Sequence, residues 1–231
     1  MLNDPYASPF EDVQEVGAVI KMLQPEQRHV GFLYKSLGGA ARMLHLGWHH
    51  DLRDEDAKLD YSWVQCGLDP VNRLLLAGAV VQIAAQREVP INYSPIYQGE
   101  YFESGSLKYT RTAPGEGLTC ATFIIAVMNS LSLKLFEAEA WPTRQDDGKW
   151  VQAIASHLAA CGADQDHVEA IKASPSSARF RPEEVAGAFT ESAVPVPFEK
   201  AESLGLAILD ELKEKENPSS SLSADGSGIA Q

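Results

Sequence analysis

Positive charge is scarce in this chain of 231 residues. Its 19 lysines and arginines face 32 aspartates and glutamates, which gives a formal net charge of -13. A surface with this excess of negative charge repels the phosphate backbone of nucleic acids and the anionic surface of membranes over most of its area. We therefore expect neither nucleic acid nor a membrane as a partner.

Cysteine is also rare, and the chain has only Cys66, Cys120 and Cys161. An odd number of cysteines at such wide spacings fits neither a disulfide framework nor a zinc-binding pair. Free thiols of this kind suit a reducing compartment. We therefore expect no structural disulfide and no metal site built on cysteine.

The chain also lacks long apolar runs and a targeting signal. No stretch reaches the apolar length of a membrane span, and residues 1–16, MLNDPYASPFEDVQEV, lack the basic and apolar regions of a secretory signal. These features predict a soluble, cytoplasmic protein. Export by a route that reads no cleavable signal stays open.

Apolar residues are plentiful, at 45% of the chain, which is enough for one large domain with a sizeable core. We expect an arm over residues 1–12, a core over 13–140 and a helical extension packed on this core over 141–216. Residues 217–231 are rich in serine and glycine and offer little to bury, so they predict a disordered tail.

Three short apolar runs predict strands between residues 13 and 50, namely VGAVIKML, HVGFLYK and ARMLHLGW. The last two are separated by SLGGA, whose glycine pair favours a tight connection and hence an antiparallel hairpin. The acidic stretch DLRDEDAKLD at 51–60 lacks the glycine and the ligand spacing of a calcium loop. We therefore interpret it as a solvated loop.

Two helices are predicted in the middle of the chain. Residues 69–88 open with Asp69 as N-cap and Pro70 at the first helical position. Residues 120–137 carry apolar side chains at the helical period, and Thr119 is placed to cap them. From residue 141 onward the pattern is mostly helical, so strands followed by helices predict an α+β fold.

Cys120 falls in the first turn of the second predicted helix. Unpaired backbone N–H groups and the positive end of the helix dipole stabilise an anion there, which lowers the pKa of a thiol. Cysteine is also among the residues most often buried, so a packing role is the alternative. Cys66 and Cys161 lack such a setting, and we interpret both as structural.

A cysteine nucleophile needs a base, and the base usually needs an orienting partner. His29 begins one strand of the predicted hairpin and His45 lies in the other. If the hairpin turns about Leu37, the two imidazoles lie opposite each other on one face and can form a hydrogen-bonded pair. A two-residue turn on Gly38 and Gly39 would place them on opposite faces instead.

Both segments resemble a known family. HVGFLYKSLGGAARMLHLGW resembles the histidine hairpin of the NlpC-type cysteine peptidases and of the related lecithin:retinol acyltransferase group. LTCATFI is similar to their nucleophile segment, where a cysteine at a helix start is followed by two residues and an aromatic one. The histidines precede the cysteine here, as in the circularly permuted branch of this papain-like superfamily. The resemblance covers roughly a seventh of the chain.

This resemblance implies a small antiparallel sheet packed on a nucleophile helix. It implies Cys120 as nucleophile, His29 as general base and His45 as the orienting third member, with neither a metal nor an organic cofactor. His49 is an alternative base, because its position has the parity of His45 along the strand. His157 and His167 lie among polar neighbours on predicted helices, and we interpret them as solvent-facing.

The implied activity is that of a cysteine hydrolase, an amidase or thiol protease, or of an acyltransferase that attacks an amide or ester carbonyl. The acidic charge and the lack of an export signal favour a peptide, protein-tail or small amide substrate. The connection of the hairpin is longer than usual in the family, and residues 141–216 have no counterpart there, so the substrate stays open. The alternative is a non-catalytic binding or adaptor protein whose acidic helical half docks a basic partner.

Overall fold

The structure is a computed structural model of the chain, and it describes residues 1–36, 38–174 and 177–216. An antiparallel sheet has the strand order β4-β3-β2-β1-β5. Its strands are β1 (Val16–Gln24), β2 (Gln27–Lys35), β3 (Ala41–Trp48), β4 (Asp51–Asp56) and β5 (Ser62–Gln65). The first four strands form a meander, and β5 returns to pair with the free edge of β1.

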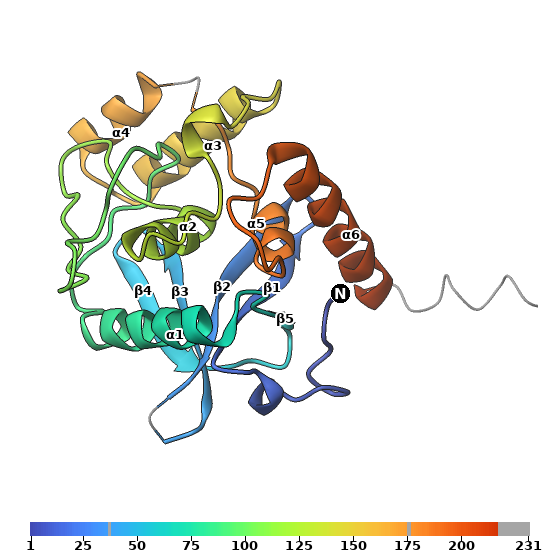
Figure 1. The fold of residues 1–231 in the computed structure, drawn as a ribbon. Coiled ribbons are helices and arrows are strands. Elements are labelled where there is room, and N and C mark those ends of the chain that lie inside the picture. Colours follow the sequence, from blue (N-terminus) through green and yellow to red (C-terminus); the bar gives the residue numbers. More distant parts are fainter. Residues whose placement is uncertain (37, 175–176, 217–231) are drawn as a thin grey trace, which may run out of the picture.

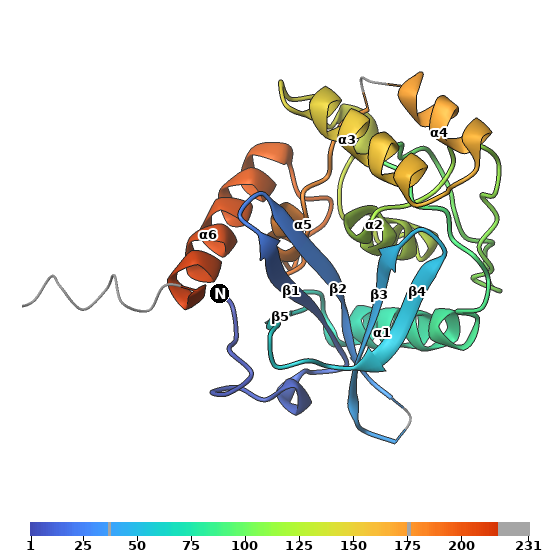
Figure 2. The same cartoon turned by 180° about the vertical axis from the view of Figure 1, so that it is seen from behind.

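The helices lie on one face of this sheet and beyond one of its ends. They are α1 (Pro70–Ala85), α2 (Cys120–Ser130), α3 (Asp147–Ala160), α4 (Gln165–Lys172), α5 (Pro182–Ala188) and α6 (Phe198–Glu216). Helices α1, α2 and α5 pack against the strands, α6 packs on α5, and α3 lies beside α4 (Figure 1). Over the described part of the chain, the view from behind shows no α-helix on the other face of the sheet (Figure 2). The architecture is therefore α+β, as predicted.

Alternation along the strands gives each face of the sheet its own core. On the helical face, Val30 and Phe32 of β2 join the main core with residues of α1, α2 and α5. On the other face, Leu33 of β2 joins a smaller core that Phe10 and Val13 cover from the N-terminal side. The predicted arm over residues 1–12 thus helps to close the helix-free face.

The main core continues through the predicted helical extension. Buried side chains of α3, α4, α5 and α6 belong to the same cluster as the strands, including Val151, Ile171, Val185 and Ile208. Residues 141–216 therefore share their hydrophobic core with residues 13–140. The tail predicted over 217–231 lies outside the described residues.

Helix α1 is confirmed close to its predicted bounds. The Asp69 carboxylate accepts hydrogen bonds from the backbone N–H groups of Val71 and Asn72, at 2.9 and 3.1 Å. Helix α2 begins at Cys120 as predicted but ends at Ser130 rather than at residue 137.

The early end of α2 has a local backbone cause. Ser132 takes a left-handed conformation, with φ of 61°, and the N–H of Leu133 donates to the carbonyl of Met128 at 3.0 Å. This closes the last turn as a Schellman-type C-cap without the usual glycine. The apolar pattern continues past this point because the following loop is also buried.

The interpretation of residues 51–60 as a solvated loop is wrong for its first half. Residues 51–56 form β4, which pairs with β3 through a tight turn that holds His50 at a φ of 59°. Backbone pairing with a strong neighbouring strand forms this edge strand despite its charged side chains. The correction brings Glu55 next to the histidines of the sheet.

Candidate functional site

The site is built where β2 and β3 part. Their ladder runs from Lys35–Ala41 to Phe32–Leu44 and stops there. Beyond this point the two strands diverge, and Figure 2 shows them opening toward α3. We call the region of residues 27–31 of β2 and 45–48 of β3 the fork. A side chain on Gly31 would place its Cβ 2.6 Å from Cβ of His45, so only glycine fits where the fork begins.

His29 and His45 meet across the fork. Nε2 of His29 lies 2.7 Å from Nδ1 of His45, which confirms the predicted hydrogen-bonded pair on one face of the sheet. The predicted turn about residue 37 is wrong, because Lys35 pairs with Ala41 and the hairpin is centred on residue 38. The two histidines are therefore diagonal neighbours rather than directly opposite.

Glu55 extends the histidine pair into a relay. Oε1 of Glu55 lies 3.0 Å from Nε2 of His45. A carboxylate only accepts, so Nε2 of His45 donates to Glu55, and the bare Nδ1 of His45 accepts from Nε2 of His29. This assignment leaves a lone pair on Nδ1 of His29. The nitrogen has no hydrogen-bond partner among the described residues, so it is the atom that can take a proton.

Burial keeps the two imidazoles neutral. It lowers the pKa of His29 to about 3, with the positive charges of His45 and Lys21 acting in the same direction. Burial also lowers the pKa of His45, more than the bond to Glu55 raises it. For Glu55, burial raises the pKa, but the hydrogen bonds from Lys58 and His45 outweigh it, so the carboxyl is ionised at neutral pH.

The nucleophile candidate, Cys120, is the first residue of α2. Thr119 caps this helix as predicted. Oγ1 of Thr119 accepts from the N–H of Thr122 at 3.1 Å, and Oγ1 of Thr122 accepts from the N–H of Thr119 at 2.7 Å. This reciprocal capping box fixes the direction of the first turn and with it the position of the thiol.

The Cys120 thiol is protonated at neutral pH, contrary to the expectation from the helix terminus. Burial raises its pKa, and the N–H groups of Val30 and Ala121, together with the charge of Arg179, only oppose the rise. The side chain is 5% exposed. The predicted lowering of the thiol pKa is therefore wrong, because desolvation outweighs the helix dipole.

The thiol and the histidine pair lie against the same segment of β2, but on opposite faces of the sheet. Val30 follows His29, and its N–H faces the Cys120 sulfur, at the point where β3 has left the ladder. The ring of His29 leans across the fork to reach His45. In the described structure no hydrogen bond joins the sulfur to His29, so the resting site holds a neutral thiol and a neutral imidazole on either side of this strand.

A cavity of about 440 Å³ opens onto Cys120, and we call it the thiol cavity. It lies between the turn that joins β1 to β2, helix α3 and the segment before α5. Its walls are mostly aromatic and apolar, with two arginines. They include Arg28, Trp48, Tyr93, Trp150, Ile154, Arg179 and Phe180.

Tyr93 is a site residue that the sequence did not predict. Its ring packs on Trp48 with 4.3 Å between centroids, and its hydroxyl faces the backbone N–H of Cys120. Two histidines hold its backbone. The N–H of Tyr93 donates to Nδ1 of His49 at 3.1 Å, and its carbonyl lies 3.0 Å from Nε2 of His167. Sequence offers no signal for it, since it sits in a loop and its neighbours in the structure, His49 and His167, are distant in the sequence.

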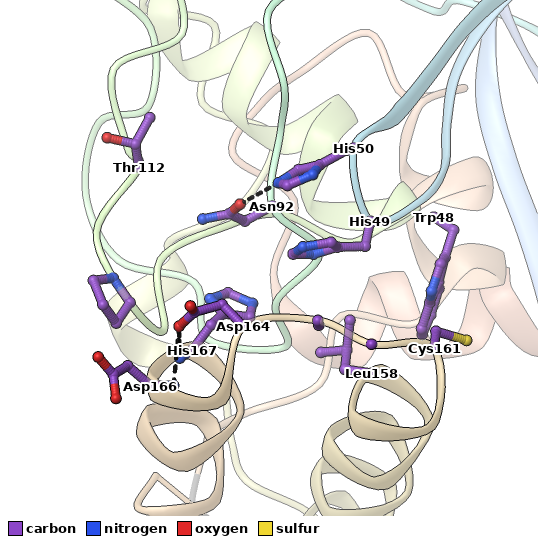
Figure 3. Close-up of a pocket in the computed structure, with 13 residues that line it drawn as sticks. Trp48, His49, His50, Asn92, Thr112, Leu158, Cys161, Asp164, Asp166 and His167 are labelled. Carbon is purple, nitrogen blue, oxygen red and sulfur yellow. Dashed lines mark hydrogen bonds between the residues drawn. The ribbon is translucent and has the colours of Figure 1, made fainter.

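The alternative base, His49, lines a different cavity of about 630 Å³, which we call the histidine pocket (Figure 3). Its ring stacks on His50 at 3.9 Å between centroids, and Nε2 of His50 lies 2.7 Å from Oδ1 of Asn92. Burial lowers the pKa of His49 to about 4, with His50 and His167 acting in the same direction. With Nδ1 bound to Tyr93, His49 acts here on the position of Tyr93.

The remaining histidines and cysteines differ in their surroundings. His167 is buried, with Nδ1 accepting from the N–H of Gly115 at 3.0 Å, so its interpretation as solvent-facing is wrong. His157 is exposed as expected, and its Nε2 lies 3.8 Å from the exposed thiol of Cys161. Cys66 is buried, which raises the pKa of its thiol to about 11.

Over residues 1–36, 38–174 and 177–216, no group of three or more histidine, cysteine or acidic side chains is arranged to hold a metal ion. Within the same residues, no helix has the length and apolar character needed to cross a membrane.

Comparison of the chain with protein-family models, with curated proteins and with solved structures gave no match.

Proposed function

We propose that the protein is a cysteine-dependent hydrolase that attacks an amide or ester carbonyl, with a permuted papain-like arrangement of its site. Cys120 is the nucleophile, His29 the general base, and His45 with Glu55 the relay that orients His29. The relay is the observation that carries this proposal. It leaves a lone pair on Nδ1 of His29 and connects this ring through His45 to the negative charge of Glu55, which a general base needs and a packing pair does not. His29 directly precedes Val30, whose N–H faces the Cys120 sulfur.

The first step is attack by the thiol. The S–H proton of Cys120 moves to Nδ1 of His29 as the sulfur forms a bond to the carbonyl carbon. Because both groups are neutral at rest, proton transfer accompanies the attack. The imidazolium that forms is stabilised through His45 by the negative charge of Glu55.

The developing oxyanion needs hydrogen-bond donors. The backbone N–H of Cys120 is one donor, and the hydroxyl of Tyr93 beside it is the second. Burial raises the pKa of Tyr93 well above its usual value, so this hydroxyl keeps its proton and can donate. Loss of one such donor costs on the order of 3 kcal/mol of transition-state stabilisation.

Collapse of the tetrahedral intermediate breaks the bond to the leaving amine or alcohol, which takes the proton from His29. Water then attacks the acyl-enzyme and gives a proton to His29. The carbon–sulfur bond breaks as His29 passes this proton to the sulfur, which restores the neutral thiol and imidazole. The apolar walls of the thiol cavity suit a peptide or a small amide with an apolar group near the scissile bond.

Acylation by p-nitrophenyl acetate, a small activated ester, tests this proposal. We expect the acetyl group on Cys120, located by peptide mass, and steady release of p-nitrophenol as the acyl-enzyme turns over. Cys120→Ala should abolish both. Cys161→Ser is the matched control, because it removes an exposed thiol that also lies near a histidine and should leave turnover unchanged.

The proposal fails if the acetyl group is found first on Cys161 or Cys66, or if Cys120→Ala releases p-nitrophenol as fast as the parent. In that case Cys120 is a packing residue, and the binding or adaptor alternative takes the place of the hydrolase.

A further inference from the structure

Arg179 is the cation of the thiol cavity that lacks a partner. It lines this cavity with Cys120, and its positive charge reaches the thiol. Among the described residues its guanidinium forms no ion pair, and its Nε is buried without a hydrogen-bond partner. Burial lowers the pKa of Arg179, although the guanidinium stays charged at neutral pH.

The neighbouring arginines are all paired. Arg28 binds Glu183 through two nitrogens, Arg144 binds Glu184, and Arg181 binds Asp146 at 2.9 Å. The carboxylates near Arg179 are therefore already engaged. Arg179 is half-buried, and removing a charge from water without a counter-charge is costly, so an unpaired cation that lines a cavity marks a candidate ligand site.

Arg179 is also held in place. Its guanidinium lies over the ring of Trp150, 4.7 Å from the centroid. Its backbone N–H donates to Asp147 at 3.1 Å, and its carbonyl accepts from Arg144 at 2.8 Å. The planar fork of an arginine fixed in this way matches the two oxygens of a carboxylate.

We infer that Arg179 binds a carboxylate of the substrate, so that the acyl donor carries an acidic side chain or a free terminal carboxylate next to the scissile carbonyl. That the bound carboxylate belongs to an acyl donor rests on the proposed function, whereas the binding of a carboxylate by Arg179 does not. A singly charged carboxylate fits better than a phosphate, since the walls around Arg179 are aromatic and the exposed Glu26 lies on the rim.

Binding can be measured without turnover. In a Cys120→Ala background, we would titrate the α-amides of N-acetylglutamate and N-acetylglutamine, which differ only in one side-chain carboxylate, and inorganic phosphate. The indole N–H signals of the tryptophans would be followed by NMR. We expect the glutamate derivative to shift the Trp150 signal and to bind at least about tenfold more tightly than the glutamine derivative. Arg179→Gln should remove this preference, and Arg179→Lys should keep part of it.

Arg181→Gln is the matched control, because Arg181 is two residues away and already paired with Asp146. It should leave the preference intact. Equal binding of the two derivatives, or tighter Arg179-dependent binding of phosphate, would overturn the inference. A second arm uses the parent protein and compares acylation of Cys120 by the α-thioesters of N-acetylglutamate and N-acetylglutamine. Preferred binding of the acid without acylation would support the carboxylate site and reject the hydrolase. Acylation at equal rates by both thioesters would support the hydrolase and reject the carboxylate site.

Discussion

His29 has one ring nitrogen bound to His45 and one left free, and this asymmetry depends on a single carboxylate. Glu55 fixes the proton on Nε2 of His45, and His45 in turn fixes the proton on Nε2 of His29. Without that carboxylate either imidazole can adopt the other tautomer, which would put a proton on Nδ1 of His29, the atom proposed to accept the proton of the thiol.

Glu55→Ala should therefore lower the rate of acylation of Cys120 about 10- to 100-fold, a positioning effect smaller than the loss of the base itself. Stability should change little, because the Glu55 side chain is 28% exposed. Asp56→Ala is the control, since Asp56 is the next residue of β4 and its side chain is 90% exposed. Equal rates in the parent and both variants would remove Glu55 from the site.

The buried, neutral state of His29 also predicts acid sensitivity. Its pKa is about 3 in the folded protein against an ordinary value of 6.5, so between these values the unfolded chain binds more protons. The free energy of unfolding must then fall as the pH falls through this window. Relative to neutral pH, His29 alone should remove about 2 kcal/mol at about pH 5.

Urea unfolding at neutral pH and at about pH 5 measures this loss. His29→Gln, which does not titrate, should reduce the difference between the two conditions by about 2 kcal/mol. An unchanged pH dependence in this variant would show that His29 is protonated or solvated in the folded state.

For single residues, the sequence predicts where the side chains lie better than it predicts their protonation states. The even separation of His29 and His45 places both on one face only if the hairpin is centred on a residue, and the register centred on residue 38 meets this condition. The pKa of Cys120 could not be predicted, since it depends on how deeply distant segments bury the thiol. Glu55 was not predicted as a site residue, because its charged neighbours give no strand pattern. The edge strand β4 forms through backbone pairing with β3.

Between elements, the important feature is the parting of β2 from β3. The ladder ends at Phe32–Leu44, and Gly31 lets the strands cross closely before they diverge. This frees the N–H of Val30 to face the thiol instead of β3. Sequence patterns predicted the three strands and the start of α2, but they could not predict where a ladder ends, because that depends on the packing of α2 behind it.

Gly31→Ala tests this geometry. The new methyl would lie 2.6 Å from Cβ of His45 and 3.2 Å from the carbonyl oxygen of Leu44, so β3 would have to move. We expect a loss of about 1–3 kcal/mol in the free energy of unfolding, together with loss of the histidine pair.

Gly78→Ala is the matched control. Gly78 lies in α1, and a methyl group added there would meet no atom within 4 Å, so this change should stabilise the protein by about 0.5–1 kcal/mol. Thermal or urea unfolding measures the stability of both variants. If Gly31→Ala leaves the free energy of unfolding unchanged, the strands are not in close contact at the fork.

For the whole molecule, the late helices are part of the structure that supports the site. Helix α5 packs against β1, β2 and α2, and α6 packs on α5. Arg28 at the start of β2 binds Glu183 of α5, and both side chains are buried, at 7% and 2% exposure. This ion pair fixes the end of β2 that carries His29, so residues 141–216 support the site as well as enclosing its cavity.

Glu183→Gln should destabilise the protein by about 3–5 kcal/mol, because it leaves the Arg28 cation buried without its counter-charge. Asp146→Asn is the control, since it weakens an ion pair with Arg181 at the surface and should cost less than about 1 kcal/mol. The free energies come from urea unfolding followed by circular dichroism. Similar values for both variants would contradict a structural link between β2 and α5.

The central claim is that His29 takes the proton of Cys120, and the rate of Cys120 acetylation by p-nitrophenyl acetate tests it most directly. The parent and His29→Gln would be compared at neutral pH, with the acetyl group located by peptide mass in each case. The account predicts a rate about 10²- to 10⁴-fold lower in the variant, because general-base assistance is lost. Equal rates in the two proteins, with both acetylated at Cys120, would contradict it.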